Sequence, residues 1–137
     1  GPLLDRIDIQ CDIQPVPYTM LKDDQPTESS AAIRERVIRA RAVQQHRFAE
    51  YNQTAKAPIH CNAQMTPKLV REFCQLDTKG DKMLSYAMDK MGLSARAYDR
   101  ILKVARTIAD LDSSENILMQ HISEAISYRS LDREDWV

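Results

Sequence analysis

The chain has 137 residues, of which 43% are apolar and 28% are charged, a balance typical of one soluble domain and unlike a disordered or fibrous protein. Its formal net charge of −1 excludes a global attraction to nucleic acid or to an anionic membrane, so either partner would need a local patch. The three glycines are fewer than a β-sandwich or barrel with many tight turns would need. This shortage favours helices.

The sequence contains no apolar run as long as the roughly 18 to 20 residues that span a bilayer, and no signal-peptide pattern at its start. Its cysteines, Cys11, Cys61 and Cys74, are odd in number and form no C-x-x-C pair. We therefore expect a cytoplasmic protein with reduced thiols and no membrane partner. Because the chain does not begin with Met, we also expect it to be part of a longer protein.

The charge divides the chain near residue 30. Residues 1–30 carry a net charge of −4 and residues 31–137 carry +3. Apolar and polar residues alternate over residues 7–13, which predicts a half-buried strand, and Pro15 and Pro17 follow it. A single strand without a partner is unstable. We therefore predict an extended or disordered segment over residues 1–28, followed by a separate domain over residues 29–137.

The second part shows helical patterns throughout. Ser29 and Ser30 offer caps for a helix over residues 31–51. Its apolar stripe, which Gln44 interrupts, consists of Ile33, Val37, Ala40, Phe48 and Tyr51. Thr66 and Pro67 begin a short helix that reaches Cys74. Further helices are predicted over residues 78–91, ended by Gly92, over residues 95–111, capped by Ser94, and over a last segment that begins after residue 115 and ends near Tyr128. The predicted fold class is all-α, a small bundle of four or five helices.

No complete catalytic motif is present: phosphate loop, dinucleotide fingerprint, zinc-protease helix and nucleophile elbow are all missing. His60 and Cys61 are adjacent and lack a second ligand pair, so we predict no metal site and interpret them as a loop histidine beside a buried thiol. His46 and His121 have no nucleophile or carboxylate at a catalytic spacing, and we interpret both as structural or surface residues.

Three cations follow helical spacing on the predicted helix 95–111: Arg96, Arg100 and Lys103. Arg96 lies in the first turn, where the helix dipole disfavours a positive charge, so its position calls for an anionic partner. A bound phosphate is one such partner. A neighbouring carboxylate on a solvated face is the other, and spacing alone favours this second interpretation.

Two more groups of arginines are candidates. Arg6 lies between Asp5 and Asp8, where acidic neighbours could hold it or where it could point toward another subunit. The helix over residues 31–51 carries a local net charge of +3, and its Arg36 and Arg39 are candidates for a nucleic-acid patch. Its arginines occupy two sides of the helix, however, which is more typical of a solvated helix than of one that binds in a nucleic-acid groove.

Five short motifs occur in an order that resembles the C-terminal part of the magnesium-chelatase-like AAA+ ATPases, in the branch that includes competence protein M. The resemblance covers essentially the whole chain. The motifs are Gly1-Pro2-Leu3-Leu4-Asp5-Arg6-Ile7-Asp8, Glu28-Ser29-Ser30, Asn62-Ala63-Gln64, Leu93-Ser94-Ala95-Arg96-Ala97-Tyr98 and Tyr128-Arg129-Ser130-Leu131-Asp132-Arg133.

The resemblance implies roles for single residues. Residues 1–28 would be the end of an ATP-binding core and residues 29–137 its helical lid. Arg6 falls at the position of an arginine finger, which acts on the nucleotide of a neighbouring subunit in a ring. Arg96 falls at the position of the sensor-2 arginine, which contacts the ATP phosphates, and Arg100 is a weaker candidate for the same contact.

The function implied is that of a lid and subunit-communication domain in a homo-oligomeric, hexameric ATPase that uses ATP and Mg²⁺ and remodels DNA. Its partners would be its own core, neighbouring subunits and DNA. Without the phosphate loop, we expect this chain alone to be monomeric and to hydrolyse no ATP. The alternatives are a chelatase subunit that drives metal insertion into a porphyrin, and a stand-alone helical domain that binds nucleic acid through Arg36 and Arg39.

Overall fold

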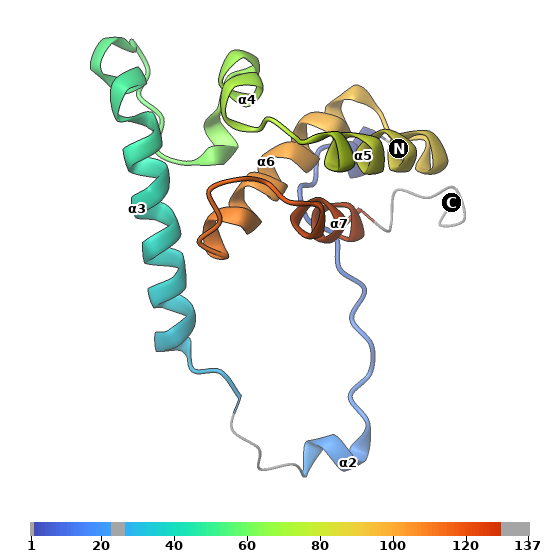
Figure 1. Cartoon of the computed structure of the whole chain (residues 1–137). Coiled ribbons are helices and arrows are strands. Elements are labelled where there is room, and N and C mark those ends of the chain that lie inside the picture. Colours follow the sequence, from blue (N-terminus) through green and yellow to red (C-terminus); the bar gives the residue numbers. More distant parts are fainter. Residues whose placement is uncertain (1, 23–26, 130–137) are drawn as a thin grey trace.

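The computed structural model describes residues 2–22 and 27–129 (Figure 1). Within them the backbone forms seven α-helices and one 3-10 helix, and the only β pairing is an isolated bridge between Leu76 and Ile117. The predicted all-α fold is confirmed. The elements in chain order are α1 (Pro2–Asp5), α2 (Tyr18–Leu21), α3 (Ser30–Thr54), η1 (Asn62–Gln64), α4 (Pro67–Phe73), α5 (Thr78–Met91), α6 (Ala95–Leu111) and α7 (Met119–Ser127).

Local capping chemistry sets the ends of the central helices. The Thr66 hydroxyl accepts the Leu69 amide at 3.3 Å, and Pro67 follows as the first residue of α4. α5 ends at Gly92, whose φ of 61° is left-handed. The Ser94 hydroxyl then accepts the Ala97 amide at 3.1 Å and begins α6. These predicted boundaries are confirmed.

The core forms where α6 packs against α7, α3, α4 and η1. α5 covers the other side of α7, and Gly80 permits this approach, because a Cβ there would lie 2.7 Å from Ile122 Cδ1. Phe48 of α3 meets Phe73 of α4 edge to face, with ring centroids 5.9 Å apart. The buried apolar cluster consists of Phe48, Ile59, Met65, Leu69, Val70, Cys74, Leu84, Ile101, Leu102, Ala105, Ala109, Ile117, Ile122 and Ala125.

The interpretation of α3 needs a correction. Its predicted stripe includes Ile33 and Val37, but both are exposed, because the N-terminal half of the helix projects beyond the bundle (Figure 1). Gln44, which interrupts the apolar pattern, is instead buried, and its side-chain oxygen accepts the Asn62 amide at 2.9 Å. A buried hydrogen bond therefore replaces apolar contact at this position.

The strand predicted over residues 7–13 is wrong. These residues form no helix or strand, and the expected alternation of burial is absent: Gln10 is 5% exposed, whereas the other residues of the segment, Ile13 at 88% among them, are exposed. The backbone amide of Gln10 donates to the Tyr128 carbonyl oxygen at 2.7 Å, so the segment packs on the end of α7 instead of pairing with a strand. The extended N-terminal segment, by contrast, agrees with the prediction.

The last helix begins later than its apolar pattern indicates. Ile117 and Leu118 precede α7, and Ile117 is buried beside Leu76 in the isolated bridge. The predicted boundary near residue 28 stays a prediction. Residues 23–26 of the linker and residues 130–133 of the last motif lie outside the described residues. No helix in the described part is long and apolar enough to span a bilayer.

Candidate functional site

The N-terminus of α6 presents a positive surface. Ser94 caps the amide of Ala97, and the amides of Ala95 and Arg96 in the same turn have no acceptor within the helix. The exposed side chain of Arg96 adds a full charge at this end. A helix N-terminus favours anions, so the local chemistry suits an incoming phosphate or carboxylate.

The other two cations on this face of α6 have partners. Arg100 forms an ion pair with Asp8 of the N-terminal segment. Lys103 pairs with Asp99 at 3.2 Å and approaches the Ala63 carbonyl oxygen at 3.4 Å. In the part of the chain that the structure describes, Arg96 makes no ion pair and no side-chain hydrogen bond. It is the member of this cationic row that remains available to a ligand.

Arg6 follows α1 on the segment that packs against α7. Its side chain is exposed and has no ion pair with any residue in the described ranges. Asp8, one of its acidic neighbours in sequence, is bound to Arg100 instead. Of the two alternatives left open by the sequence, the outward orientation therefore agrees with the structure, and the partner of Arg6 stays a prediction.

The backbone on both sides of Arg6 is held by Arg129, which follows α7. The Arg129 Nη1 donates to the Ile7 carbonyl oxygen at 2.6 Å, and Nη2 donates to the Leu4 carbonyl oxygen at 3.0 Å. The arginine is fully buried. It belongs to the last of the sequence motifs, but nothing in its spacing predicted a contact with the other end of the chain.

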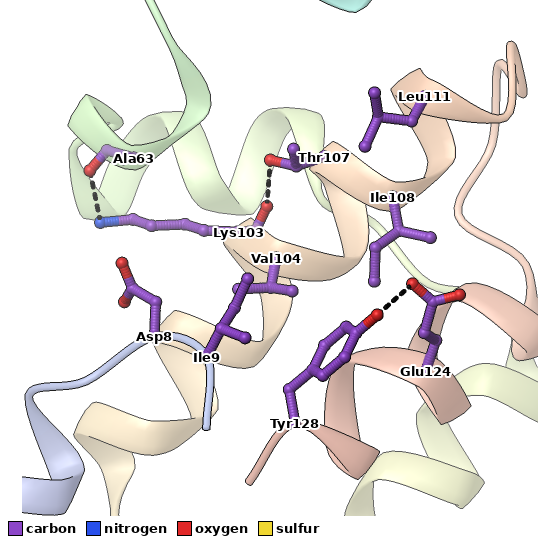
Figure 2. A pocket seen from close by; sticks show the side chains of 10 residues that line it. All are labelled: Asp8, Ile9, Ala63, Lys103, Val104, Thr107, Ile108, Leu111, Glu124 and Tyr128. Atoms are coloured by element: carbon purple, nitrogen blue, oxygen red, sulfur yellow. Dashed lines mark hydrogen bonds between the residues drawn. The ribbon is translucent and has the colours of Figure 1, made fainter. Parts of the chain in front are cut away.

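A shallow groove lies beside these contacts, between the N-terminal segment, α6 and α7 (Figure 2). It has a volume of about 300 Å³. The Tyr128 hydroxyl donates to the Glu124 carboxylate at 3.0 Å across its edge, and this bond raises the pKa of the tyrosine. The remaining lining residues are Asp8, Ile9, Ala63, Lys103, Val104, Thr107, Ile108 and Leu111.

The candidate nucleic-acid arginines lie on the projecting half of α3. Arg36 forms an ion pair with Glu28, whereas Arg39 is exposed. The Glu28 carboxylate raises the pKa of Arg36, and the same hydrogen bond lowers the pKa of Glu28. These two arginines belong to α3, whereas Arg96 belongs to α6 and Arg6 follows α1, and no hydrogen bond or ion pair among the described residues joins the two pairs.

A buried polar network joins α3, η1 and α6. Arg47 donates to both carboxylate oxygens of Asp110, at 2.7 and 2.8 Å, and Asn62 donates to the same carboxylate at 2.9 Å. Arg106 lies 3.2 Å from Asp110 and donates to the carbonyl oxygens of Ser114 and Glu115. Burial lowers the pKa of Arg106, and the Asp110 charge opposes this shift.

Sequence reasoning missed this network. Asn62 stands in one of the quoted motifs, which is the available signal, but a single sequence does not show which polar residues are buried. Most of its polar groups bond to one another or to backbone carbonyl oxygens, although the buried Nε of Arg106 has no hydrogen-bond partner among the described residues, and we interpret the network as structural.

Among the described residues, none of the three histidines is hydrogen-bonded to a serine, threonine or cysteine side chain. His121 is buried: its Nδ1 accepts the Leu118 amide at 2.9 Å and its Nε2 donates to Asp112 at 2.8 Å, which fixes the start of α7. His46 and His60 are exposed, and Cys61 is half-buried. Within the described residues, no group of three or more His, Cys, Asp or Glu is placed to hold a metal ion.

Comparison with known proteins defines the class of this all-helical chain. It belongs to the family described as magnesium chelatase, subunit ChlI C-terminal, whose match extends over residues 27–129. The resemblance noted in the sequence is therefore confirmed.

The chain is similar to longer curated proteins. It is 41% identical over 134 residues to the uncharacterized protein YifB of Escherichia coli and 37% identical over the same length to the competence protein ComM of Haemophilus influenzae. It is 28% identical over 129 residues to the uncharacterized protein Rv2897c of Mycobacterium tuberculosis. These alignments cover 97%, 97% and 94% of this chain, but the chain spans only 24% of the length of each relative.

Proposed function

We propose that this chain is the lid domain of a cytoplasmic AAA+ ATPase, in which Arg96 contacts the phosphates of bound ATP. The observation that carries the proposal is the state of Arg96. Arg100 and Lys103 on the same helix face are bound to carboxylates, whereas Arg96 stands exposed at the positive end of α6. Arg96 makes no ion pair within the described residues, and an exposed cation at a helix N-terminus suits a ligand phosphate.

The residues present fit the phosphate part of ATP. Arg96 and the free amides of the first turn of α6 would donate to phosphate oxygens. The described residues offer no cluster for Mg²⁺, so we assign the ion to no residue of this chain. Because the sequence contains no phosphate-binding loop and spans only 24% of the length of its relatives, we expect the chain alone to hydrolyse no ATP and assign the loop to the rest of a longer protein.

Arg6 is the second functional residue of the proposal. It is exposed on a segment fastened to the lid, which suits an arginine finger that reaches the nucleotide of a neighbouring subunit in a homo-oligomeric, hexameric ring. Such a finger neutralises charge that develops on the transferred phosphoryl group. Arg100 contributes less directly, because Asp8 already engages its guanidinium.

Two substrates are candidates for the proposed ATPase. Similarity to the competence protein ComM favours DNA remodelling, and we take this as the leading function. The family description supports the alternative of a chelatase subunit that drives metal insertion into a porphyrin. A stand-alone nucleic-acid module is less well supported, because Arg36 is already paired with Glu28.

The test measures ATP hydrolysis by the full-length protein that carries this domain, with and without branched DNA. We expect branched DNA to stimulate the wild type, and we expect Arg6→Ala to lower kcat by about 1,000-fold or more. Arg71→Ala is the matched control, because Arg71 is an exposed arginine on α4. If branched DNA does not stimulate ATP hydrolysis and Arg6→Ala does not lower kcat, a DNA-remodelling ATPase with its arginine finger at Arg6 is excluded.

A further inference from the structure

Residues 4–10, here called the N-terminal strap, are fastened to the two helices that carry the proposed lid function. Arg129 holds the carbonyl oxygens of Leu4 and Ile7, so its guanidinium fork spans the backbone on both sides of Arg6. The Gln10 amide donates to the carbonyl oxygen of Tyr128. The strap is thereby tied to the C-terminal end of α7.

A second tie connects the strap to α6. Asp8 pairs with Arg100, which lies four residues, or about 6 Å along the helix axis, from Arg96. The strap that carries Arg6 and the helix that carries Arg96 are therefore joined through Asp8, and α6 and α7 pack directly on each other. Arg6 and Arg96 belong to one connected unit.

We infer that Arg129 is the positioning residue for Arg6, and that through it the arginine finger follows the movement of the lid. The inference rests on the proposed function. A lid that responds to ATP through Arg96 would carry Arg6 with it, so the nucleotide state of one subunit would set the placement of the finger at the next. This gives the ring a mechanical route for communication between neighbouring sites.

Arg129 contributes more to this fastening than the Asp8–Arg100 pair does. The Asp8 side chain is half exposed, and exposed ion pairs add little stability because water and salt screen them. Arg129 is fully buried, and it satisfies carbonyl oxygens at the end of α1. Its planar fork reaches two acceptors at once, which the single ammonium group of a lysine does not reproduce.

The first measurement is amide hydrogen exchange in the full-length protein for the wild type and Arg129→Lys. The backbone amides of Arg6 and Ile7 donate to the carbonyl oxygens of Leu3 and Leu4 in α1, and that of Gln10 donates to Tyr128, so all three report on the fastening of the strap. We expect Arg129→Lys to lose protection at these three amides while α6 keeps its protection. Arg106→Lys is the matched control, because Arg106 is also buried and also donates to two carbonyl oxygens, at the far end of α6.

The second measurement is steady-state ATP hydrolysis by the same variants. A misplaced finger lowers kcat, by about 100-fold for a displacement of 1 Å, and we expect KM for ATP to stay within twofold. Because Arg129 acts through Arg6, the double variant Arg6→Ala, Arg129→Lys should be no slower than Arg6→Ala. The surface variant Asp8→Ala, which leaves the core intact, should loosen the strap and lower kcat to a smaller extent.

The outcomes separate this inference from the proposed function. A strap that loosens with kcat unchanged, or a double variant that is slower than Arg6→Ala, would overturn the positioning role. If Arg96→Ala lowers turnover but Arg6→Ala does not, the inference falls and the lid function stands. If neither substitution lowers turnover, the proposed function itself falls.

Discussion

Arg47 and Asp110 lie 63 positions apart in the chain and meet in the core as a two-point ion pair, with nitrogen to oxygen distances of 2.7 and 2.8 Å. The pair joins α3 to α6. Asp110 also accepts from Asn62 and lies beside Arg106, so one carboxylate serves two guanidinium groups. Asp110 therefore helps to place α3 against the bundle, together with the Phe48–Phe73 contact and the Gln44–Asn62 hydrogen bond.

Removal of Asp110 should destabilise the fold strongly. Asp110→Ala leaves Arg47 and Arg106 without their shared counter-charge, and we expect the free energy of unfolding to fall by about 3–5 kcal/mol. Urea denaturation of the chain measures this change. Asp99→Ala is the control: Asp99 pairs with Lys103 nearer the surface, and its loss should cost less than about 1 kcal/mol. Equal losses for the two variants would show that the buried network carries no special share of stability.

The stability of the chain should depend on the ionisation of Asp112 in acid. The hydrogen bond from His121 lowers the pKa of the Asp112 carboxyl below its ordinary value of 3.8. A lowered pKa means that this contribution is present above pH 3.8 and is lost as the pH falls below that value. Thermal unfolding between pH 2 and pH 6 should show a difference in Tm between the wild type and Asp112→Asn that becomes smaller as the pH falls. A difference in Tm that does not change with pH would contradict this role of Asp112.

The three cysteines should differ sharply in reactivity. Burial raises the pKa of the Cys74 thiol to about 12, so almost none of it is thiolate at pH 8. Cys11 is exposed. We expect iodoacetamide at pH 8 to label Cys11 rapidly and Cys74 only after unfolding, as mass spectrometry of timed samples would show. Labelling in urea is the control, because all three thiols should react in the unfolded chain. Rapid labelling of Cys74 in the folded chain would contradict the prediction.

Gly92 should tolerate asparagine better than alanine. Its φ of 61° is left-handed, and a Cβ at this position would meet nothing within 4 Å, so a substitution costs backbone strain alone. Gly92→Ala should lower the free energy of unfolding by about 1–2 kcal/mol, and Gly92→Asn by less. Denaturation by urea distinguishes the two variants. If Gly92→Asn lowers the free energy of unfolding more than Gly92→Ala does, backbone strain does not determine the cost of substitution at this position.

Local signals in the sequence predicted much of the bundle. Ser94, Thr66 and Gly92 mark helix ends through hydrogen bonds or backbone angles that involve only a few neighbouring residues. Such signals are legible in one sequence, and the helices that they bound were predicted closely. The late start of α7 is the exception, because the bridge between Ile117 and Leu76 takes Ile117 out of the helical pattern.

Contacts between distant parts of the chain were not predictable in the same way. The isoleucines of residues 7–13 alternate as in a strand, yet the buried residue there is Gln10, because Tyr128 and Arg129 offer partners for its segment. Burial of Gln44 depends likewise on Asn62. At the candidate site, the sequence predicts the position of Arg96 in the first turn of α6. It does not predict that Arg100 pairs with Asp8, because these two residues lie 92 positions apart in the chain.

Titration of the full-length protein with ATP measures whether Arg96 binds the phosphates of ATP, as proposed. The comparison is between the wild type, Arg96→Ala and the control Arg71→Ala. Because a hydrogen bond to a charged group contributes about 1.5–3 kcal/mol, we predict that Arg96→Ala weakens ATP binding by about 10- to 100-fold. The exposed side chain has no partner in the described fold, so its loss should leave thermal stability unchanged. Unchanged ATP affinity in Arg96→Ala would show that Arg96 does not bind the phosphates of ATP.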